Sequence, residues 1–184
     1  LFAPKLHGAM KHAIGPRREL GVRTLFNMLG PLTNPAGATA LVIGVYASEL
    51  TKVFADVLQQ LGVERALVVH GDDGLDEITG TTTTTVSELK QGEVTNYTLD
   101  PRDYIGDYCD PADLVGGEPT ENARLVRAVL EGEDGPRRRV AQLNAAAGIY
   151  VEGLAEDLTQ AYELARAAVD EGNARAKLKA MIEF

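Results

Sequence analysis

The feature that most constrains the fold is a strand, a helix and a second strand that follow one another with short connections. Ala40 to Tyr46 is a continuous apolar run with one glycine, too short for a typical helix and rich in β-branched residues. Leu50 to Leu61 carries apolar residues three and four positions apart, with Ser48 as a candidate N-cap and Gly62 as the stop. Ala66 to Val69 is a second buried strand. This pattern predicts two parallel strands joined by a right-handed helical crossover.

The remaining segments extend this pattern on both sides. Before the first strand we expect two short helices, and after the second strand we expect a strand pair, an irregular stretch and three helices. These elements span residues 2–13, 22–29, 81–89, 93–99, 101–117, 120–131, 136–151 and 156–182, with a candidate break near Gly172. The fold class that follows is α/β, with a mainly parallel central sheet flanked by helices.

Length and composition place the chain among globular proteins and argue against several partners. A chain of 184 residues with 45% hydrophobic and 24% charged residues can bury the core of one domain. No apolar run approaches the ~20 residues that span a bilayer, so no membrane partner is expected. The formal net charge of −9 argues against nucleic acid, because phosphate binding needs a basic surface. The single cysteine, Cys109, rules out an internal disulfide and favours a reducing cytoplasm.

An acidic turn follows the second strand. Ligand sites of parallel α/β sheets lie beyond the carboxyl ends of the strands, and there the chain enters the segment from Gly71 to Glu77. Asp76 and Glu77 are the best metal candidates, because magnesium is usually held by one or two carboxylates together with substrate phosphates. The alternative is a solvated turn without a ligand, since Asp and Gly are common turn formers. Spacing and position leave both interpretations open.

The segment before the strands holds candidate anion-binding side chains. The forked guanidinium groups of Arg17 and Arg23 match a carboxylate, although either can instead pair with an acid such as Glu19. His7 and His12 are five residues apart, which is not the same-face spacing of two metal ligands on a helix. The residues alone therefore favour surface or core-edge positions for both histidines.

Two further polar residues are interpreted as structural. His70 ends the second strand, where a lone histidine usually serves the fold. Asn144 falls inside an otherwise apolar helical segment, where a buried amide needs hydrogen-bond partners. The sequence contains neither a Walker-type phosphate loop nor a GxGxxG dinucleotide motif.

Three segments form a specific combination. The most specific is Arg17 to Pro35, followed by Asp73-Gly74-Leu75-Asp76-Glu77 and, more weakly, Leu143-Asn144-Ala145-Ala146. Together they resemble the anthranilate phosphoribosyltransferases of tryptophan biosynthesis, and the resemblance runs through the whole chain in order. It implies the large-domain part of the nucleoside phosphorylase and phosphoribosyltransferase-like fold. It also implies a glycosyltransferase that joins anthranilate to phosphoribosyl pyrophosphate and releases pyrophosphate.

The resemblance also implies roles for individual residues. Arg17 corresponds to the arginine that contacts anthranilate, and His7 falls at a position that lines the anthranilate channel. Asp76 and Glu77 correspond to the magnesium-binding acidic pair, so Mg²⁺ is the implied cofactor and would act as a Lewis acid on the leaving pyrophosphate. Many members have Pro where this chain has Gly8, which leaves the assignment intact.

Several segments of the family have no counterpart in this chain. The Gly-Thr-Gly-Gly-Asp phosphate loop, the Lys-His-Gly-Asn-Arg and Asn-Ile-Ser-Thr segments and the helical dimerisation domain all precede the position of Leu1 in the family. Residues 1–184 are therefore expected to be the C-terminal part of the catalytic domain of a homodimeric enzyme, with an exposed sheet edge and little activity alone. The alternatives are a non-catalytic module that binds anthranilate or magnesium-phosphate, an inert remnant, and a nucleic-acid-binding relative that the net charge opposes.

Overall fold

The computed structural model describes residues 30, 32 and 37–183. The chain divides into two compact units, Leu1–Thr39 and Ala40–Phe184, and the second unit contains every strand of the described residues. The helices expected over 2–13 and 22–29, and the candidates His7, His12, Arg17 and Arg23, lie outside the described residues. Within the part that is described, no helix is both long enough and apolar enough to cross a membrane.

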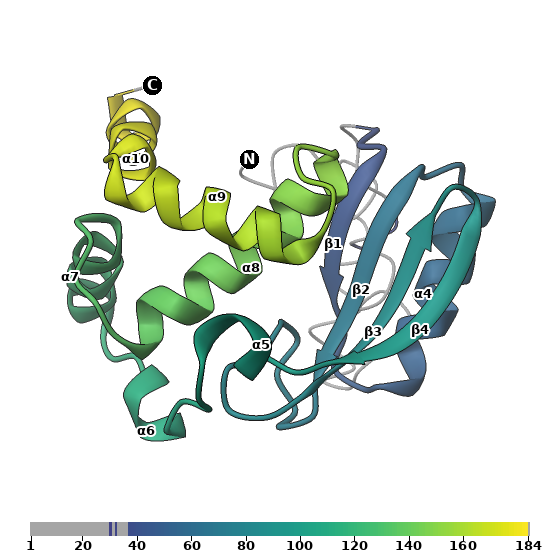
Figure 1. Ribbon diagram of the computed structural model, residues 1–184, viewed down its shortest axis with the longest axis horizontal. Helices are drawn as coiled ribbons and strands as arrows, with labels where there is room; N and C mark the ends of the chain where they lie inside the picture. The colour runs from purple at the N-terminus through teal and green to yellow at the C-terminus, as the bar shows by residue number, and fades with distance from the viewer. Residues whose placement is uncertain (1–29, 31, 33–36, 184) are drawn as a thin grey trace, which may run out of the picture. The chain divides into compact units, whose positions relative to one another are not determined.

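Four strands of the second unit form one mixed sheet (Figure 1). They are β1 (Ala40–Gly44), β2 (Arg65–Gly71), β3 (Thr84–Lys90) and β4 (Glu93–Leu99), and they lie in this order across the sheet. β1 and β2 are parallel, as expected, whereas β2 and β3, and β3 and β4, are antiparallel. The α/β class is confirmed, but the expected mainly parallel sheet is corrected to a mixed sheet over the residues that the structure describes.

The turn between β3 and β4 explains one antiparallel pair. Gln91 and Gly92 have φ angles of 54° and 78°, the left-handed conformation that a two-residue type I′ turn requires at both positions. A turn this short connects antiparallel strands only, because parallel strands need a crossover of a dozen residues or more. The first of these strands is shorter than the expected span of 81–89, since Thr81 to Thr83 lie in the loop before β3.

Helix α4 (Glu49–Gln60) follows β1 and packs on the sheet through buried side chains at Thr51, Phe54, Ala55 and Leu58. Ser48 occupies the N-cap position, as expected, but its backbone is helical and its side chain makes no capping hydrogen bond. Its carbonyl instead accepts a hydrogen bond from the Thr51 hydroxyl at 2.9 Å. The helix is therefore positioned by packing on the sheet rather than by a side-chain cap.

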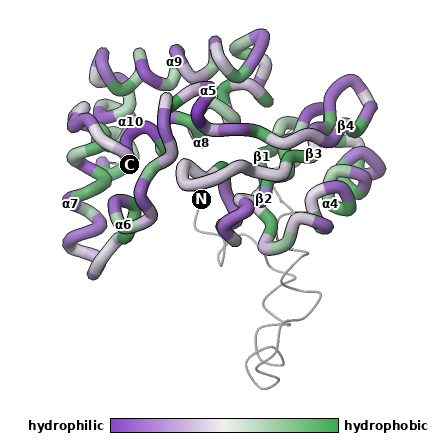
Figure 2. The backbone as a smooth tube through the Cα atoms, turned by 60° about the horizontal axis from the view of Figure 1, so that its bottom comes forward, coloured by the Kyte–Doolittle hydropathy of each residue, from purple (hydrophilic) through white to green (hydrophobic). Residues whose placement is uncertain are grey.

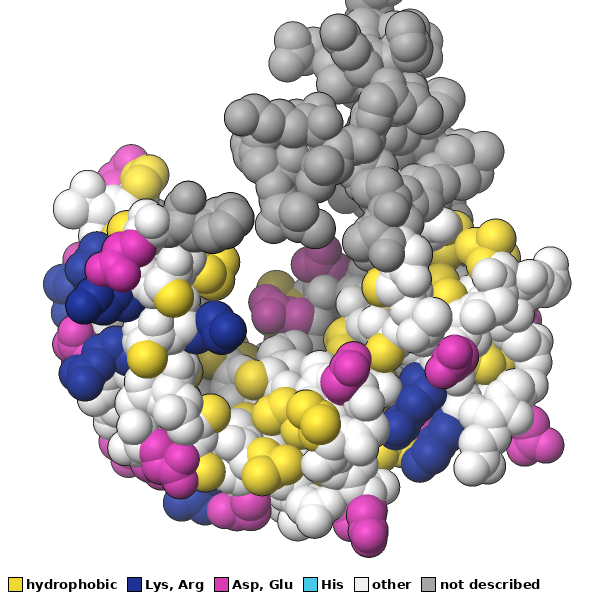
Figure 3. All heavy atoms as spheres, turned by 90° about the horizontal axis from the view of Figure 1, so that it is seen from above, with side chains coloured by type: hydrophobic (Ala, Val, Ile, Leu, Met, Phe, Trp, Pro, Cys, Tyr) yellow, Lys and Arg dark blue, Asp and Glu magenta, His cyan; other side chains and the backbone are white. Residues whose placement is uncertain are grey.

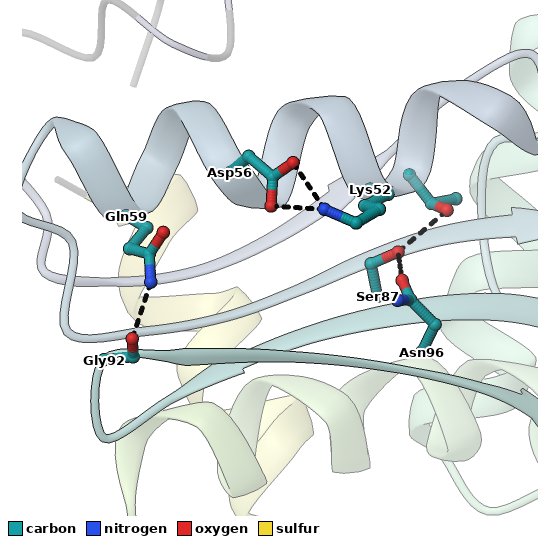
Figure 4. A network of polar contacts seen from close by, with 7 residues as sticks. Lys52, Asp56, Gln59, Ser87, Gly92 and Asn96 are labelled. Carbon is teal, nitrogen blue, oxygen red and sulfur yellow. Dashed lines mark hydrogen bonds and ion pairs between the residues drawn. The ribbon is translucent and has the colours of Figure 1, made fainter.

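Polar contacts join α4 to the hairpin of β3 and β4 (Figure 4). The Ser87 hydroxyl lies 2.9 Å from the Thr51 hydroxyl and 2.7 Å from Oδ1 of Asn96. The Gln59 side-chain amide donates a hydrogen bond to the Gly92 carbonyl at 2.5 Å. These bonds pair polar groups beneath the helix and help to fix its position over the hairpin.

The C-terminal half of the chain is helical. The helices are α5 (Arg102–Ile105), α6 (Pro111–Leu114), α7 (Pro119–Leu130), α8 (Pro136–Glu152), α9 (Leu158–Asp170) and α10 (Asn173–Glu183). The expected break is confirmed, because Gly172 has a φ angle of 77° between α9 and α10. The stretch over 101–117 was expected to be irregular, with Asp113 and Leu114 in one turn. That turn is confirmed as the one-turn helix α6, and the structure adds a second one-turn helix, α5. Along the helices, short hydrophobic and hydrophilic stretches alternate (Figure 2), which is typical of helices with one buried face.

The alternation of side chains along β2 divides the core into two layers. Leu67 and Val69 belong to a buried cluster with residues of α8 and α9, whereas Ala66 and Val68 alternate with them and point to the other face, which α4 covers. In α8, Ala146 is fully buried in the same cluster, and its small side chain allows close packing. Helix α8 is therefore held between the sheet and α9 (Figure 1).

The helical part of the surface carries mixed charge. Figure 3 shows Lys and Arg side chains gathered with acidic ones over the side where α7 and α10 lie. Exposed ion pairs such as Arg124–Glu121 at 2.8 Å and Lys179–Glu183 at 3.8 Å account for part of this mixing. Because exposed pairs contribute at most about 1 kcal/mol each, this region depends mainly on packing for its stability.

Candidate functional site

The acidic turn leaves β2 at Gly71 and folds back on itself. The Gly71 N–H donates to the Leu75 carbonyl at 2.8 Å, and the Gly74 N–H donates to the Gly71 carbonyl at 2.8 Å. Gly74 has a φ angle of 95°, a conformation that favours glycine. The Asp72 N–H donates to the Thr83 carbonyl at 2.9 Å, so the turn is also bound to the segment that leads into β3.

The turn rests on the end of β1. A Cβ atom at Gly44 would lie 1.5 Å from the carbonyl oxygen of Asp76, so glycine is needed for this close approach of two backbones. Beside it, Nδ1 of His70 lies 2.8 Å from the Val45 carbonyl, which confirms the structural role expected for this histidine. The carboxyl ends of two parallel strands therefore hold the turn, as the strand pattern predicts.

Asp73 is held by hydrogen bonds within the turn. The hydroxyl groups of Thr79 and Thr81 each donate to its Oδ2 at 2.5 Å, and the Leu75 N–H donates to its Oδ1 at 3.2 Å. Burial acts to raise the pKa of the Asp73 carboxyl, but these donors outweigh it and hold the pKa below its usual range. The negative charge of Asp73 is therefore already compensated within the fold.

Asp73→Asn should lower the free energy of unfolding near neutral pH by about 1–2 kcal/mol, because an amide replaces a charged acceptor of three hydrogen bonds. A carboxyl with a depressed pKa stabilises the fold above its ordinary pKa and loses that contribution as the pH falls. Stability should therefore fall less on acidification in the variant than in the parent chain. Urea unfolding at a series of pH values measures both effects.

The control for this prediction is Asp107→Asn. Asp107 is exposed and accepts no hydrogen bond from another described residue. Identical pH profiles of the unfolding free energy for the two variants would contradict the prediction.

A second pair of threonines holds Asp72. The Thr83 hydroxyl donates to its Oδ2 at 2.5 Å, and the Thr85 hydroxyl donates to its Oδ1 at 3.0 Å. The run of five threonines, expected to favour extended structure, therefore also stabilises the turn by donating hydrogen bonds to its carboxylates. Its alternate members Thr81, Thr83 and Thr85 all donate to Asp72 or Asp73. The signal in the sequence is their spacing of two, which places side chains on one side of an extended chain.

Asp76 and Glu77 have no such partners in the described part of the chain. Both residues are exposed, and neither carboxylate accepts a hydrogen bond from another described residue. Partial burial of the carboxyl raises the pKa of Glu77, and the negative charges of Asp76 and Asp73 raise it further. Among the described residues, no group of three or more His, Cys, Asp and Glu side chains is placed to hold a metal ion. The pair therefore suits a cation whose coordination is completed by water or a bound anion.

Asn144 fixes the residue that follows the acidic pair. Its Oδ1 accepts a hydrogen bond from the Ile78 N–H at 3.0 Å, and its Nδ2 donates to the Ile78 carbonyl at 2.8 Å and to the Val140 carbonyl at 3.1 Å. Ile78 is 0% exposed, so both of its backbone groups depend on this amide. The structural role expected for Asn144 is confirmed. The structure adds its location: Asn144 anchors α8 to the residue next to Glu77.

A cavity of about 570 Å³ lies beside the turn. Glu77 and Asp73 line it from the turn, while Arg137 and Asn144 line it from α8. Asp76 does not line this cavity, so the two carboxylates of the pair have different surroundings. The cavity is therefore lined by the Glu77 carboxylate, which can contact a cation, and by the Arg137 guanidinium group, which can contact an anion.

Arg137 was not among the candidates from the sequence. Its Nη2 donates to the Val115 carbonyl at 2.9 Å, whereas its buried Nε has no hydrogen-bond partner in the described residues. The overlooked signal is a run of three arginines in the first turn of α8. Positive charge at a helix N-terminus opposes the helix dipole, so a run of this kind indicates that the guanidinium groups serve another purpose.

Comparison with known proteins gives a consistent result. The sequence matches the "Glycosyl transferase family, a/b domain" over residues 1–175. An anthranilate phosphoribosyltransferase of Desulfosudis oleivorans is 54% identical over 185 residues, which cover 100% of this chain and 55% of the relative. The protein of that name from Geobacter sulfurreducens is 52% identical over 182 residues, which cover 99% of this chain and 52% of the relative. The chain thus spans about half the length of the curated relatives it matches.

Solved structures show the same relationship. Anthranilate phosphoribosyltransferase from Thermus thermophilus superposes with a TM-score of 0.86 at 42% identity, covering 95% of this chain and 51% of that chain. The protein from Saccharomyces cerevisiae in complex with PRPP and Mg superposes with a TM-score of 0.85 at 27% identity, covering 96% of this chain and 51% of that chain. Of the candidate site residues, Asp76 and Glu77 lie together on the turn, whereas Arg17 and His7 lie outside the described residues.

Proposed function

Because the chain belongs to the glycosyl transferase family and carries its a/b domain, we propose that it is the C-terminal part of an anthranilate phosphoribosyltransferase. The complete protein would transfer the phosphoribosyl group to anthranilate in the cytoplasm, as a step of tryptophan biosynthesis. The observation that carries the proposal is the pair of carboxylates on the turn beyond β2, Asp76 and Glu77, which accept no hydrogen bond from another described residue. Relatives of this name that match the chain from end to end support it.

We further propose that Asp76 and Glu77 hold Mg²⁺. The donor set fits, because carboxylate oxygens are hard ligands and a pair of them leaves coordination positions for phosphate oxygens. The raised pKa of Glu77 supports this assignment, since a bound cation would relieve the repulsion from Asp76 and Asp73. When bound, the ion would stabilise negative charge on the leaving pyrophosphate as a Lewis acid.

In this proposal, the residues of the chain bind and orient the substrates, and none of them forms a covalent bond with a substrate. Asn144 holds the backbone next to Glu77. Arg137 would offer an anionic group in the cavity its Nε–H, which has no hydrogen-bond partner among the described residues. For anthranilate we propose contacts with Arg17, whose planar fork suits a carboxylate, and with His7. Nucleophilic attack would come from the anthranilate amine, so no side chain of the described residues is assigned as a catalytic acid, base or nucleophile.

The proposed activity belongs to a complete protein of about twice this length, because this chain aligns with only 55% or less of the length of each of these relatives. The resemblance implies that the glycine-rich phosphate loop and the dimerisation domain lie in the other half. Backbone N–H groups of such a loop would supply much of the stabilisation of the transition state. We therefore expect little or no transferase activity from the isolated chain.

A chimera tests the proposed function. This chain replaces the segment of the D. oleivorans relative that aligns with it over 185 residues, and loss of anthranilate fluorescence is followed with phosphoribosyl pyrophosphate and Mg²⁺. We expect consumption by the chimera, none by the isolated chain, and none by a chimera with Asp76→Asn and Glu77→Gln. The matched control removes another adjacent acidic pair, with Glu133→Gln and Asp134→Asn, and should remain active. A folded but inactive chimera beside an active relative would refute the proposal.

Metal binding by the isolated chain gives a readout that needs no activity. The parent chain should bind Mn²⁺, measured by the electron paramagnetic resonance signal of the free ion, and Mg²⁺ should compete. Asp76→Asn with Glu77→Gln should weaken this binding about tenfold, while the Glu133 and Asp134 control should not. Because the pKa of Glu77 is raised, protons should displace the ion at a higher pH than at an ordinary glutamate. Equal Mn²⁺ affinities for the two double variants would rule out this metal site.

A further inference from the structure

A second cavity, of about 450 Å³, lies between α5, the first half of α8 and α9. Its lining is mainly polar and includes three arginines, two tyrosines and a glutamine, namely Arg138, Arg139, Arg166, Tyr104, Tyr162 and Gln142. These residues of α8 lie on a different face of the helix from Arg137 and Asn144, which line the cavity at the acidic turn. The proposed transferase function uses none of the six side chains.

Positive charge is concentrated at this cavity. Arg138 and Arg139 belong to the first turn of α8, whose N-terminus adds positive partial charge and has no side-chain cap at Gly135. Arg166 approaches from α9. Burial raises the pKa of the Tyr162 phenol and the charge of Glu163 raises it further, whereas Arg166, Arg139 and Arg138 each act to lower it. All three guanidinium groups therefore lie close enough to Tyr162 for their positive charges to affect the same phenol group.

Gln142 supplies a buried donor without an acceptor. The residue is only 4% exposed, yet its Nε2 makes no hydrogen bond in the part of the chain that the structure describes. Native proteins rarely retain a buried polar group that is unsatisfied. Because Gln142 lines the cavity, an acceptor atom bound there could accept a hydrogen bond from one of its N–H groups.

The carboxylates around the cavity leave several donors unused. Asp170 pairs with Arg138. Asp134 is 79% exposed and lies 3.8 Å from Arg139, an ion pair too long for a hydrogen bond. The Arg139 guanidinium donates no hydrogen bond to another described residue. At least one of the guanidinium groups is thus available to a ligand.

We propose that this cavity binds the phosphate group of a small phosphorylated molecule. Arg166 uses one nitrogen to contact Glu163, at 3.1 Å, and its other N–H groups donate to no described residue. The donors come from two helices and include the Gln142 amide, so they suit a tetrahedral anion that accepts from several directions. A carboxylate is instead matched in one plane by one guanidinium fork. The rest of the ligand would lie against Tyr104 and Tyr162, whose rings are 6.2 Å apart.

Inorganic phosphate is the probe for this site. It is titrated into the ¹⁵N-labelled chain at constant ionic strength, in parallel with chloride and acetate, and the readout is the side-chain amide resonance of Gln142. Loss of that resonance in Gln142→Met assigns it. We expect a saturable shift with phosphate and none with chloride or acetate. Arg166→Gln should weaken the phosphate affinity about tenfold, the usual scale for one charge-assisted hydrogen bond.

Arg124→Gln is the matched control. Arg124 pairs with Glu121 on α7 at the same three-residue spacing as Arg166 with Glu163 on α9, and both arginines are well exposed, so both variants should keep the fold. Equal phosphate affinities in the two variants, or phosphate binding that leaves the Gln142 resonance unmoved, would overturn the site. Saturation by acetate in place of phosphate would overturn the choice of ligand. The titration needs no transferase activity, so its failure would leave the proposed function untouched.

Discussion

Gly44→Ala should lower the free energy of unfolding by about 3 kcal/mol or more, a large effect for one methyl group. The added Cβ would lie 1.5 Å from the carbonyl oxygen of Asp76 and 2.4 Å from its carbonyl carbon. Both atoms belong to the backbone, so no change of rotamer relieves the overlap, and either β1 or the acidic turn must move. Denaturant unfolding followed by circular dichroism measures the loss. The same movement should weaken Mn²⁺ binding, because it displaces Asp76 and Glu77.

Gly148→Ala is the matched control for this substitution. Gly148 lies within α8, is exposed, and has no heavy atom within 4 Å of the position that a Cβ would take. Alanine has the higher helix propensity, so this variant should be neutral or more stable by up to about 1 kcal/mol. If Gly44→Ala proved as stable as Gly148→Ala, the close approach of β1 to the acidic turn would be wrong.

Asn144→Ala should lower the free energy of unfolding by about 2–4 kcal/mol. The side-chain amide pairs with both backbone groups of Ile78, and Ile78 is 0% exposed. Its removal leaves a buried N–H and a buried carbonyl without partners, and each costs about 1–3 kcal/mol. Denaturant unfolding measures the loss. The variant should also bind Mn²⁺ less tightly, since the position of Glu77 depends on its neighbour Ile78.

Asn122→Ala separates the effect of burial from that of the hydrogen bonds. Asn122 makes the same paired contact with Gly117, accepting from its N–H and donating to its carbonyl at 2.8 Å each, but at an exposed position. Water replaces these partners, so the loss should stay below about 1 kcal/mol and Mn²⁺ binding should not change. Equal losses for the two asparagine variants would mean that water reaches Ile78, and that α8 does not control the turn.

Local patterns in the sequence predicted most of the elements correctly. The apolar run at β1, the helical spacing of α4 and the glycine at Gly172 each reflect interactions within a few residues along the chain. The position of the acidic turn also followed, because a strand, a helix and a parallel strand place both carboxyl ends at one edge of the sheet. The cap expected from Ser48 did not form, since packing on the sheet positioned α4 without it.

Apart from the parallel pairing of β1 with β2, contacts between distant segments were not predicted. The sheet is mixed because β3 returns antiparallel to β2, and no local spacing distinguishes this pairing from a parallel one. The threonine run was expected to form a strand, yet Thr81 and Thr83 bind the carboxylates of the turn instead. Arg137 was missed because the sequence shows neither the burial of its Nε nor its place in the lining of the cavity, and both arise only when α8 packs in the folded chain.

The sequence by itself determined the fold class, the family and the acidic turn, because these depend on residue periodicity and on short motifs. Only the tertiary structure decided which carboxylates of that turn are left for a ligand. The carboxylates of Asp72 and Asp73 accept hydrogen bonds from threonine hydroxyls of the following segment, whereas those of Asp76 and Glu77 do not. The neighbouring Ile78 is held by Asn144, 66 residues further along the chain. Hydrogen bonds of this kind exist only after the chain has brought distant groups within about 3 Å of one another.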